Sequence, residues 1–468
     1  MNVEITWNEG TETLNLPAEE SEFFRNVSEK LATLPIPNTA TVSCPYGNAV
    51  YDIIKKSGTA FIREDSNTIV LPGRTTYPEV YLTCINPQFN NYKYYRLTPK
   101  GDEVIATYGR IGAEKGDMYG ERTYNYPKRM FWVKYQEKLA KGYVDQSKVY
   151  LNTGKKGNKN AGTNAAVVTQ DNIPANVLYR LLRSFAKQYV EAACVTSHVT
   201  QGMVDASRKY LDILYKRKTV KGFNNSLLKL LTVCPRKVDN VRHLLAEKVA
   251  DFSQIIDREE TLLAAMEGLV NDEMIQQSNS LIEGFHGIEV YIATDTQKKQ
   301  VLEHLNPQLH NKVKNIYRVI PQDQQKRFNA YLKANKIHKV MQLWHGSRNE
   351  NWLSIVENGL KLRPNAIITG KMFGHGIYFA PSSMKSWNYT SFKGTTWANG
   401  NSNTGFMALY ATAYGEPLDV YAAQTFSQNT LGGKNCVHAH AGAALRNDEI
   451  VYYSEDAMVI NYLVEFSE

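Results

Sequence analysis

Short apolar runs alternate with polar turns in the first part of this 468-residue chain. Residues 39–43 and 68–71 are rich in β-prone side chains, and the apolar spacing over 19–34 predicts one helix, which should end at the prolines of 35–37. This mixture predicts an α+β unit over residues 1–75. No residue in it carries a chemistry that we recognise, so its role is left open.

The pattern then becomes more regularly alternating. Runs rich in Tyr, Thr and Val (VYLTC, KYYRL and EVIATYGRIG) predict β-strands, and residues 127–140 predict a helix that stops at Lys141-Gly142. We expect a small α+β module over 76–146. Residues 152–164 (NTGKKGNKNAGTN) hold almost nothing to bury, and they predict a flexible linker that we assign to 147–168.

The period changes to that of helices in the third part, for which we expect an all-α domain over 169–280. Its first helix should bury a stripe whose members recur three and four positions apart: Val177, Leu178, Leu181, Leu182, Phe185 and Tyr189. Further helices are predicted over 203–215, 239–256 and 259–269. In residues 281–468, strand-like runs alternate with short helices, which predicts an α+β domain with antiparallel sheets. The chain is therefore expected to be multidomain.

Composition narrows the class of protein. Hydrophobic residues make up 43% and charged residues 21%, which is typical of globular proteins and excludes a disordered, collagenous or coiled-coil chain. No window approaches 18 consecutive apolar residues and the N-terminus does not resemble a signal peptide, so we expect no membrane partner and no secretion. The cysteines are scattered, without a CxxC or Cys/His cluster, so we predict neither a disulfide framework nor a metal site: Cys44, Cys84, Cys194, Cys234 and Cys436.

Motifs that carry chemistry are concentrated in the last domain. The usual Rossmann and P-loop nucleotide-binding motifs are missing from the sequence. Instead, HGS at 345–347 is followed by FGHGIYFA at 373–380, by SWNY at 386–389 and, far downstream, by NDEIVY at 447–452. This ordered set resembles the catalytic domain of the poly(ADP-ribose) polymerases, which transfer ADP-ribose from NAD+ and release nicotinamide.

The resemblance implies a role for each motif residue. His345 is expected to hydrogen-bond the adenosine ribose, while the Gly346 backbone and the Ser386 hydroxyl hold the nicotinamide carboxamide. Tyr378 and Tyr389 are expected to sandwich the nicotinamide ring, where stacking adds about 0.5–1.5 kcal/mol beyond area burial. The residues implied in NAD+ binding are His345, Gly346, Ser347, Tyr378, Lys385, Ser386 and Tyr389. NAD+ is the substrate, and no metal is implied.

Two adjacent carboxylates compete for the catalytic position. Cleavage of the glycosidic bond develops an oxocarbenium-like ribose, so the reaction needs a carboxylate near the 2′-hydroxyl. Ungapped alignment through 450–452 selects Asp448, whereas counting back from Tyr462 selects Glu449. Side chains alternate along a strand, so only one of the two is expected to point into the site. We favour Glu449, with His345 and Tyr378, as the catalytic set; Asp448 in that position would favour mono-ADP-ribosyl transfer.

The module over 76–146 resembles the WGR domain of DNA-dependent members of this family. Its signature occurs as Tyr108-Gly109-Arg110, with Tyr in place of Trp. Residues 76–160 carry 15 basic and 8 acidic side chains, a net charge of +7, whereas residues 1–75 carry 6 and 10, a net charge of −4. That basic block favours binding to a phosphate backbone, although a solvated basic face is the alternative. We therefore predict DNA contact through residues 108–110.

The all-α domain is similar in position and length to the regulatory helical domain of the same enzymes. These resemblances together predict an ADP-ribosyltransferase that is stimulated by DNA strand breaks and modifies protein acceptors, itself included. The alternatives are a mono-ADP-ribosyltransferase, or a DNA-end-binding adaptor with an inactive NAD-binding domain. The expected location is the nucleus in a eukaryote and the cytoplasm otherwise.

Overall fold

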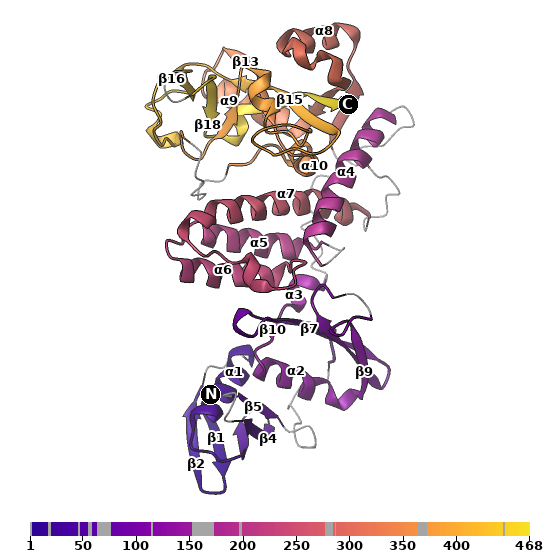
Figure 1. Ribbon diagram of the computed structural model, residues 1–468, viewed down its shortest axis with the longest axis vertical. Coiled ribbons are helices and arrows are strands. Elements are labelled where there is room, and N and C mark those ends of the chain that lie inside the picture. Colours follow the sequence, from indigo (N-terminus) through magenta and orange to yellow (C-terminus); the bar gives the residue numbers. More distant parts are fainter. Residues whose placement is uncertain are drawn as a thin grey trace. The chain divides into compact units, whose positions relative to one another are not determined.

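The computed structural model describes most of the chain (Figure 1). The described residues are 2–16, 20–44, 47–54, 59–62, 76–113, 116–151, 173–195, 199–276, 284–285, 287–362, 372–442 and 445–468. The chain divides into two compact units: one comprises 1–155, 194–207 and 224–245, and the other comprises 156–193, 208–223 and 246–468. Among the described residues, no helix combines the length and apolar character needed to span a membrane.

In the part of residues 1–145 that the structure describes, there are two antiparallel sheets and two α-helices. The first sheet has the order β2-β1-β3-β4-β5 and the second has the order β10-β6-β7-β8-β9. The elements are β1 (Asn2–Trp7), β2 (Gly10–Asn15), α1 (Glu20–Thr33), β3 (Thr39–Cys44), β4 (Gly47–Ile54), β5 (Thr59–Ile62), β6 (Val80–Asn86), β7 (Asn91–Lys100), β8 (Glu103–Arg110), β9 (Arg122–Pro127), α2 (Phe131–Ala140) and β10 (Val144–Asp145). The helices predicted over 19–34 and 127–140 are α1 and α2, while the predicted strand at 68–71 lies outside the described residues.

The N-terminal segment and the following module share one apolar core. Buried side chains of both belong to a single cluster, which runs from Val3 to Leu139, and α1 packs against α2 (Figure 1). The module continues past residue 146 into α3 (Ser147–Tyr150), where the Tyr150 ring stacks on Tyr81 at 4.3 Å. The first four residues of the predicted linker are therefore helical and packed.

The helical part contains α4 (Ile173–Ala193), α5 (Gln201–Leu214), α6 (Val220–Val233) and α7 (Phe252–Gln276). In α4 the fully buried positions include Leu178 and Leu182 of the predicted stripe. Val177 was expected in that stripe, but its side chain is 55% exposed. The buried face is instead continued by Ala186 and Val190, which follow Leu182 at a spacing of four.

The helix predicted over 239–256 does not form. Two short 3-10 turns, η4 (Val241–Leu244) and η5 (Val249–Asp251), occupy its first part. Side chains compete there for backbone donors: the Asn240 amide oxygen accepts from the Arg242 N–H, and the Asp251 carboxylate accepts from Glu247 and Lys248. Helix α7 then runs without interruption from Phe252, through the break that we expected before 259.

In the described part of the last domain, two sheets are flanked by short helices. The larger sheet has the order β11-β12-β19-β15-β13 and is antiparallel throughout. The smaller has the order β14-β18-β17-β16, and its β16–β17 pair is parallel, which corrects the expectation of purely antiparallel sheets. The elements are β11 (Ile288–Ile292), α8 (Asp295–His304), β12 (Val313–Pro321), α9 (Gln322–Ala334), β13 (Val340–Gly346), α10 (Trp352–Asn358), β14 (Ile377–Phe379), α11 (Ser383–Trp387), β15 (Thr404–Ala413), β16 (Pro417–Val420), β17 (Cys436–Ala439), β18 (Glu449–Tyr452) and β19 (Met458–Ser467).

Among the described residues, six further 3-10 turns connect these elements: η2 (Pro87–Phe89), η3 (Lys128–Met130), η6 (Pro307–Lys312), η7 (Asn349–Asn351), η8 (Gln428–Thr430) and η9 (Glu455–Ala457). The helix starts follow local rules. At α8, for example, the Thr294 hydroxyl accepts from the Gln297 N–H while the Gln297 side chain accepts from the Thr294 N–H at 2.9 Å, a capping box.

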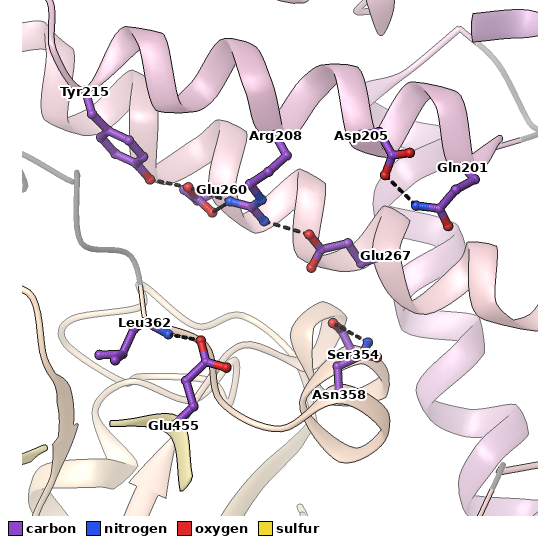
Figure 2. Close-up of polar contacts among 10 residues, drawn as sticks. All are labelled: Gln201, Asp205, Arg208, Tyr215, Glu260, Glu267, Ser354, Asn358, Leu362 and Glu455. Carbon is purple, nitrogen blue, oxygen red and sulfur yellow. Dashed lines mark hydrogen bonds and ion pairs between the residues drawn. The ribbon is translucent and has the colours of Figure 1, made fainter. Parts of the chain in front are cut away.

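Helix α7 packs on the last domain of the chain as well as on its neighbouring helices. It contacts α4 and α10, and a Cβ added at Gly268 would lie only 3.1 Å from the Leu353 side chain of α10. On another face, Arg208 of α5 donates to Glu260 and Glu267 of α7, as Figure 2 shows. Tyr215 donates to the same Glu260. A polar network and close apolar contact therefore hold α7 on two sides.

Candidate active site

The motif residues are brought together by an antiparallel bridge between two sheets. Trp344 of β13 donates its N–H to the carbonyl of Ala380 at 2.9 Å, and Ala380 donates back to Trp344 at 3.0 Å. Ala380 directly follows β14 and is the last residue of the FGHGIYFA motif. The bridge therefore brings His345 next to Tyr378, although 33 residues separate them in the chain.

His345 is held in one neutral tautomer. Its Nδ1 lies 3.0 Å from the carbonyl oxygen of Tyr378, and because a carbonyl only accepts, Nδ1 must carry the proton. Nε2 is then a hydrogen-bond acceptor. Burial lowers the pKa of the imidazole from 6.5 to about 4, an effect that the Tyr378 carbonyl opposes only in part. A neutral Nε2 is suited to accept a bond from a ribose hydroxyl.

Gly346 allows β13 to touch the start of α11. A Cβ at this position would lie 1.9 Å from the Ser386 carbonyl oxygen, so only glycine fits without a backbone shift. Ser386 itself is 4% exposed, and its hydroxyl donates to the Trp344 carbonyl at 3.0 Å. Its oxygen is left as an acceptor for an N–H of a carboxamide. Ser347 makes a different contact, in which its hydroxyl accepts from Asn351 at 3.1 Å.

The two tyrosines differ in how firmly they are fixed. The Tyr378 hydroxyl donates to the Gly374 carbonyl at 2.8 Å and accepts from the Phe373 N–H at 3.1 Å. Gly374 adopts a φ of +86°, which favours glycine. Tyr389 is 44% exposed and its ring stacks loosely on Trp397, with centroids 6.5 Å apart. One candidate stacking face is therefore rigid and the other is open to solvent.

Glu449 lies with the other motif residues. It begins β18, whose Val451 pairs with Tyr378 of β14, and its carboxylate is 2.7 Å from the ammonium of Lys385. Both side chains are nearly buried, at 12% and 13% exposure. Glu449 lies two residues before Val451, so its side chain leaves the small sheet on the same face as Tyr378. Burial raises the pKa of Tyr378 and of Tyr389, and the negative charge of Glu449 raises both further.

Asp448 points to the opposite face of the small sheet. Its carboxylate accepts from the Ala441 N–H at 2.7 Å and lies 2.9 Å from His438 Nε2. These bonds lower the pKa of Asp448 although partial burial opposes them. Strand alternation thus separates the two carboxylates, as expected, and Glu449 is the one on the side of the tyrosines.

The signature of the first module is engaged within its own unit. The Arg110 guanidinium donates to the Asn90 carbonyl at 2.9 Å and to the Asp239 carbonyl at 2.5 Å. Tyr108 is half-buried against the ring of Tyr95, with centroids 5.6 Å apart. Gly109 lies where a Cβ would meet the Gly120 carbonyl at 3.0 Å. Residues 108–110 are therefore committed to packing and to the 224–245 segment.

Sequence reasoning missed a group of exposed aromatic side chains in this module. Tyr119 is 65% exposed and Tyr124 is 56% exposed, on either side of the exposed Arg122. Residues 121–125 are all exposed, although strand β9 includes residues 122–125. The sequence signal that could have identified the group is the run Glu121-Arg122-Thr123-Tyr124-Asn125, which has no aliphatic side chain to bury.

Comparison with protein families gives the same two regions. The family model for the "Poly(ADP-ribose) polymerase catalytic domain" matches residues 290–462, and the "WGR domain" model matches residues 79–149. The first match contains all the motif residues described above. The chain thus contains a region similar to the catalytic domain of the poly(ADP-ribose) polymerases and, before it, a region similar to the WGR domain.

Similar proteins come from distant organisms. Poly [ADP-ribose] polymerase 2 of Homo sapiens is 42% identical over 100 residues, which are 21% of this chain and 16% of the human protein. The corresponding protein of Arabidopsis thaliana is 35% identical over 121 residues, 26% of this chain and 18% of the plant protein. A putative polymerase-like protein of Invertebrate iridescent virus 6 is 29% identical over 168 residues, 34% of this chain and 88% of the viral protein. The matches thus span less than a fifth of the human and plant relatives.

Proposed function

We propose that the chain is an NAD+ ADP-ribosyltransferase that forms poly(ADP-ribose) on protein acceptors, itself included. The observation that carries the proposal is the nearly buried Lys385–Glu449 ion pair beside Tyr378 and Tyr389. A carboxylate there accepts from the ribose 2′-hydroxyl, and this bond strengthens as positive charge develops at the anomeric carbon. The two tyrosines hold the departing nicotinamide between their rings.

The remaining residues position NAD+. The neutral His345 accepts from the adenosine ribose through Nε2, while Gly346 and Ser386 bind the carboxamide through backbone and hydroxyl groups. Lys385 fixes the Glu449 carboxylate and lies near the nicotinamide ribose. The bond that breaks joins nicotinamide to ribose, and the bond that forms joins the same anomeric carbon to an acceptor oxygen, with the acceptor proton released.

The test is nicotinamide release by the full chain supplied with NAD+, with and without nicked DNA. Protein-bound ADP-ribose is measured in the same samples, and Glu449→Gln is the matched control. Release with long products supports a polymerase, and release with single additions supports a mono-ADP-ribosyltransferase. If neither release nor labelling occurs, the adaptor alternative replaces the enzyme.

We also propose that DNA strand breaks bind the WGR domain and stimulate the reaction. The exposed Arg122, with Tyr119 and Tyr124 beside it, offers a cation and aromatic faces for a phosphate backbone and its bases. Arg110 then has a different part: its bonds to the Asp239 carbonyl couple the domain to the helical segment.

Helix α7 supplies a route from the helical domain to the site. Asp257 of α7 lies 3.8 Å from Arg348, which directly follows the HGS motif, and Gly268 touches α10. We propose that α7 restrains the NAD+ site until DNA binding loosens it. Gly268→Val should separate α7 from α10 and raise turnover without DNA, whereas Gly222→Val should not, because a Cβ added near the start of α6 would meet only the Thr219 and Arg217 side chains. Equal basal turnover in both variants would remove this role from α7.

A further inference from the structure

Two histidines and an aspartate converge on the face of the small sheet opposite Glu449. One ligand atom from each of Asp419, His438 and His440 lies within 4.8 Å of the other two. Asp419 Oδ1 is 2.7 Å from His440 Nε2 and 3.9 Å from His438 Nδ1. The two imidazole rings are stacked with centroids 4.0 Å apart. Two imidazoles and one carboxylate, all of which are common ligands of divalent metals, therefore lie close enough to share one ion.

The backbone fixes this arrangement. In the parallel β16–β17 pair, Asp419 is the registered neighbour of His438, so the two side chains leave the sheet on the same face. His440 lies two residues after His438 and shares that face, and its N–H donates to the Val420 carbonyl at 2.9 Å. The cluster is assembled from short side chains on paired strands. A bound ion would therefore have to fix few side-chain rotamers.

Asp448 provides an outer carboxylate. It lies 2.9 Å from His438 Nε2, so the other ring nitrogen, Nδ1, is left to accept from the Tyr414 hydroxyl at 2.7 Å and lies 3.9 Å from Asp419. The Asp448 carboxylate is itself held by the Ala441 N–H at 2.7 Å. Histidines that bind metals commonly donate their second N–H to a carboxylate of this kind, which fixes the tautomer and raises the basicity of the ligand. Binding of an ion through His438 Nδ1 would replace the hydrogen bond that this nitrogen accepts from the Tyr414 hydroxyl.

We propose that His438 Nδ1, His440 Nε2 and the Asp419 carboxylate bind one divalent ion of the zinc class, with the fourth position open to water. Zinc bonds to imidazole nitrogen and carboxylate oxygen of about 2.0–2.2 Å in a tetrahedron require ligand atoms about 3.4 Å apart. The observed separations of 2.7 and 3.9 Å lie on either side of that value. Two imidazoles select zinc or a similar transition metal over Mg²⁺ or Ca²⁺, which prefer oxygen ligands.

The ion has a path from solvent. The side chain of Asp419 is 53% exposed and that of His440 is 27% exposed. The sequence alone offers only the His-Ala-His of 438–440, which is too few ligands for a site. The third ligand comes from β16, about 20 residues earlier, and only the strand pairing reveals it.

The experiment is a zinc titration of the full chain, freed of metal and of any affinity tag, followed by calorimetry. We expect one zinc per chain, and a cobalt-loaded sample should show the visible absorption of a four-coordinate site. His440→Ala and Asp419→Asn should each weaken zinc binding at least about tenfold. Asp448→Asn should weaken it by roughly 10–100-fold, as outer-shell substitutions commonly do. His338→Ala, at an exposed histidine in the same domain, is the matched control and should bind as the unchanged chain does.

Asp419→Asn keeps the size of an exposed side chain, so it remains informative if the histidine variants fail to fold. Thermal unfolding in chelator identifies any such failure. Absence of one-to-one binding in the unchanged chain would overturn the proposal, and so would binding that survives both His440→Ala and Asp419→Asn. In either case the cluster serves only as hydrogen-bonded histidine–aspartate pairs.

Discussion

The catalytic domain and the WGR domain use their motifs in different ways. In the catalytic domain, His345, Tyr378 and Glu449 come from separate strands and meet at one site, with side chains that retain capacity to bind a ligand. In the WGR domain, Tyr108 stacks on Tyr95, and Arg110 donates hydrogen bonds to the carbonyls of Asn90 and Asp239. The catalytic motifs consist of side chains that a ligand needs, so they predict a binding site. The WGR signature consists of side chains that the fold needs, so it predicts the fold and the contact with the helical segment.

The largest effect should come from the carboxylate pair at the start of β18. Glu449→Gln should lower NAD+ turnover by a factor of about ten or more, since the loss of about 1.4 kcal/mol of transition-state stabilisation already gives tenfold. Asp448→Asn should change turnover little, because its carboxylate faces His438. Steady-state nicotinamide release measures both variants. If Asp448→Asn proved the more damaging, the catalytic role would move to Asp448.

Gly346 tests whether close backbone approach builds the site. Gly346→Ala introduces a Cβ 1.9 Å from the Ser386 carbonyl, and we expect a loss of about 1–3 kcal/mol in the free energy of unfolding together with weaker binding of a nicotinamide-mimicking inhibitor. Gly442→Ala is the control, because no atom lies within 4 Å of its added Cβ. Denaturant unfolding and inhibitor titration report the two effects. Equal behaviour of the two variants would contradict the packing argument.

Arg110 and Arg122 test which residues of the WGR domain contact DNA and which contact the rest of the chain. Arg122→Ala should reduce the slope of log affinity for nicked DNA against log salt by about 0.9, the value for one phosphate contact on duplex DNA. Arg110→Ala should leave that slope unchanged but lower stimulation by DNA several-fold. Arg110→Lys should be equally impaired, because one ammonium does not replace a guanidinium held by several bonds. A reduced slope in Arg110→Ala that lysine restores would return Arg110 to DNA contact.

The smallest effect is one of pH. Burial holds the folded-state pKa of His345 near 4, below its ordinary 6.5, so the unfolded state binds more protons between these values. The contribution of His345 to stability is therefore complete above pH 6.5 and is lost as the pH falls toward 4. The pH dependence of unfolding should be shallower for His345→Gln over that window. Inhibitor affinity of the unchanged chain should be flat from pH 6 to 8; a titration near 6.5 would mean that the imidazole is solvated.

Local pattern predicted α1, α2 and the strands around them because each buries one face with a clear period. It failed at 239–256, where the Asn240 and Asp251 side chains bind backbone donors that a helix would use, and at Val177, because the burial of a helix face depends on its neighbours. The residues of the candidate site could be named because their motifs resemble those of a known family. Their partners could not: the Lys385–Glu449 pair and the Asp419–His440 contact join residues more than 20 positions apart, and only strand pairing brings them together.

Helix α7 has a mechanical consequence. Its 25 residues form one continuous helix about 37 Å long. Arg208 donates hydrogen bonds to Glu260 and Glu267 on this helix, and Gly268 packs against Leu353. Each turn of a helix is stabilised by the next, so its interior amides should exchange with deuterium as a block. Loss of the Arg208 hydrogen bonds would raise the amide exchange rate at Gly268 as well as near Glu260. The length of α7 thus sets the distance over which the loss of one contact raises amide exchange.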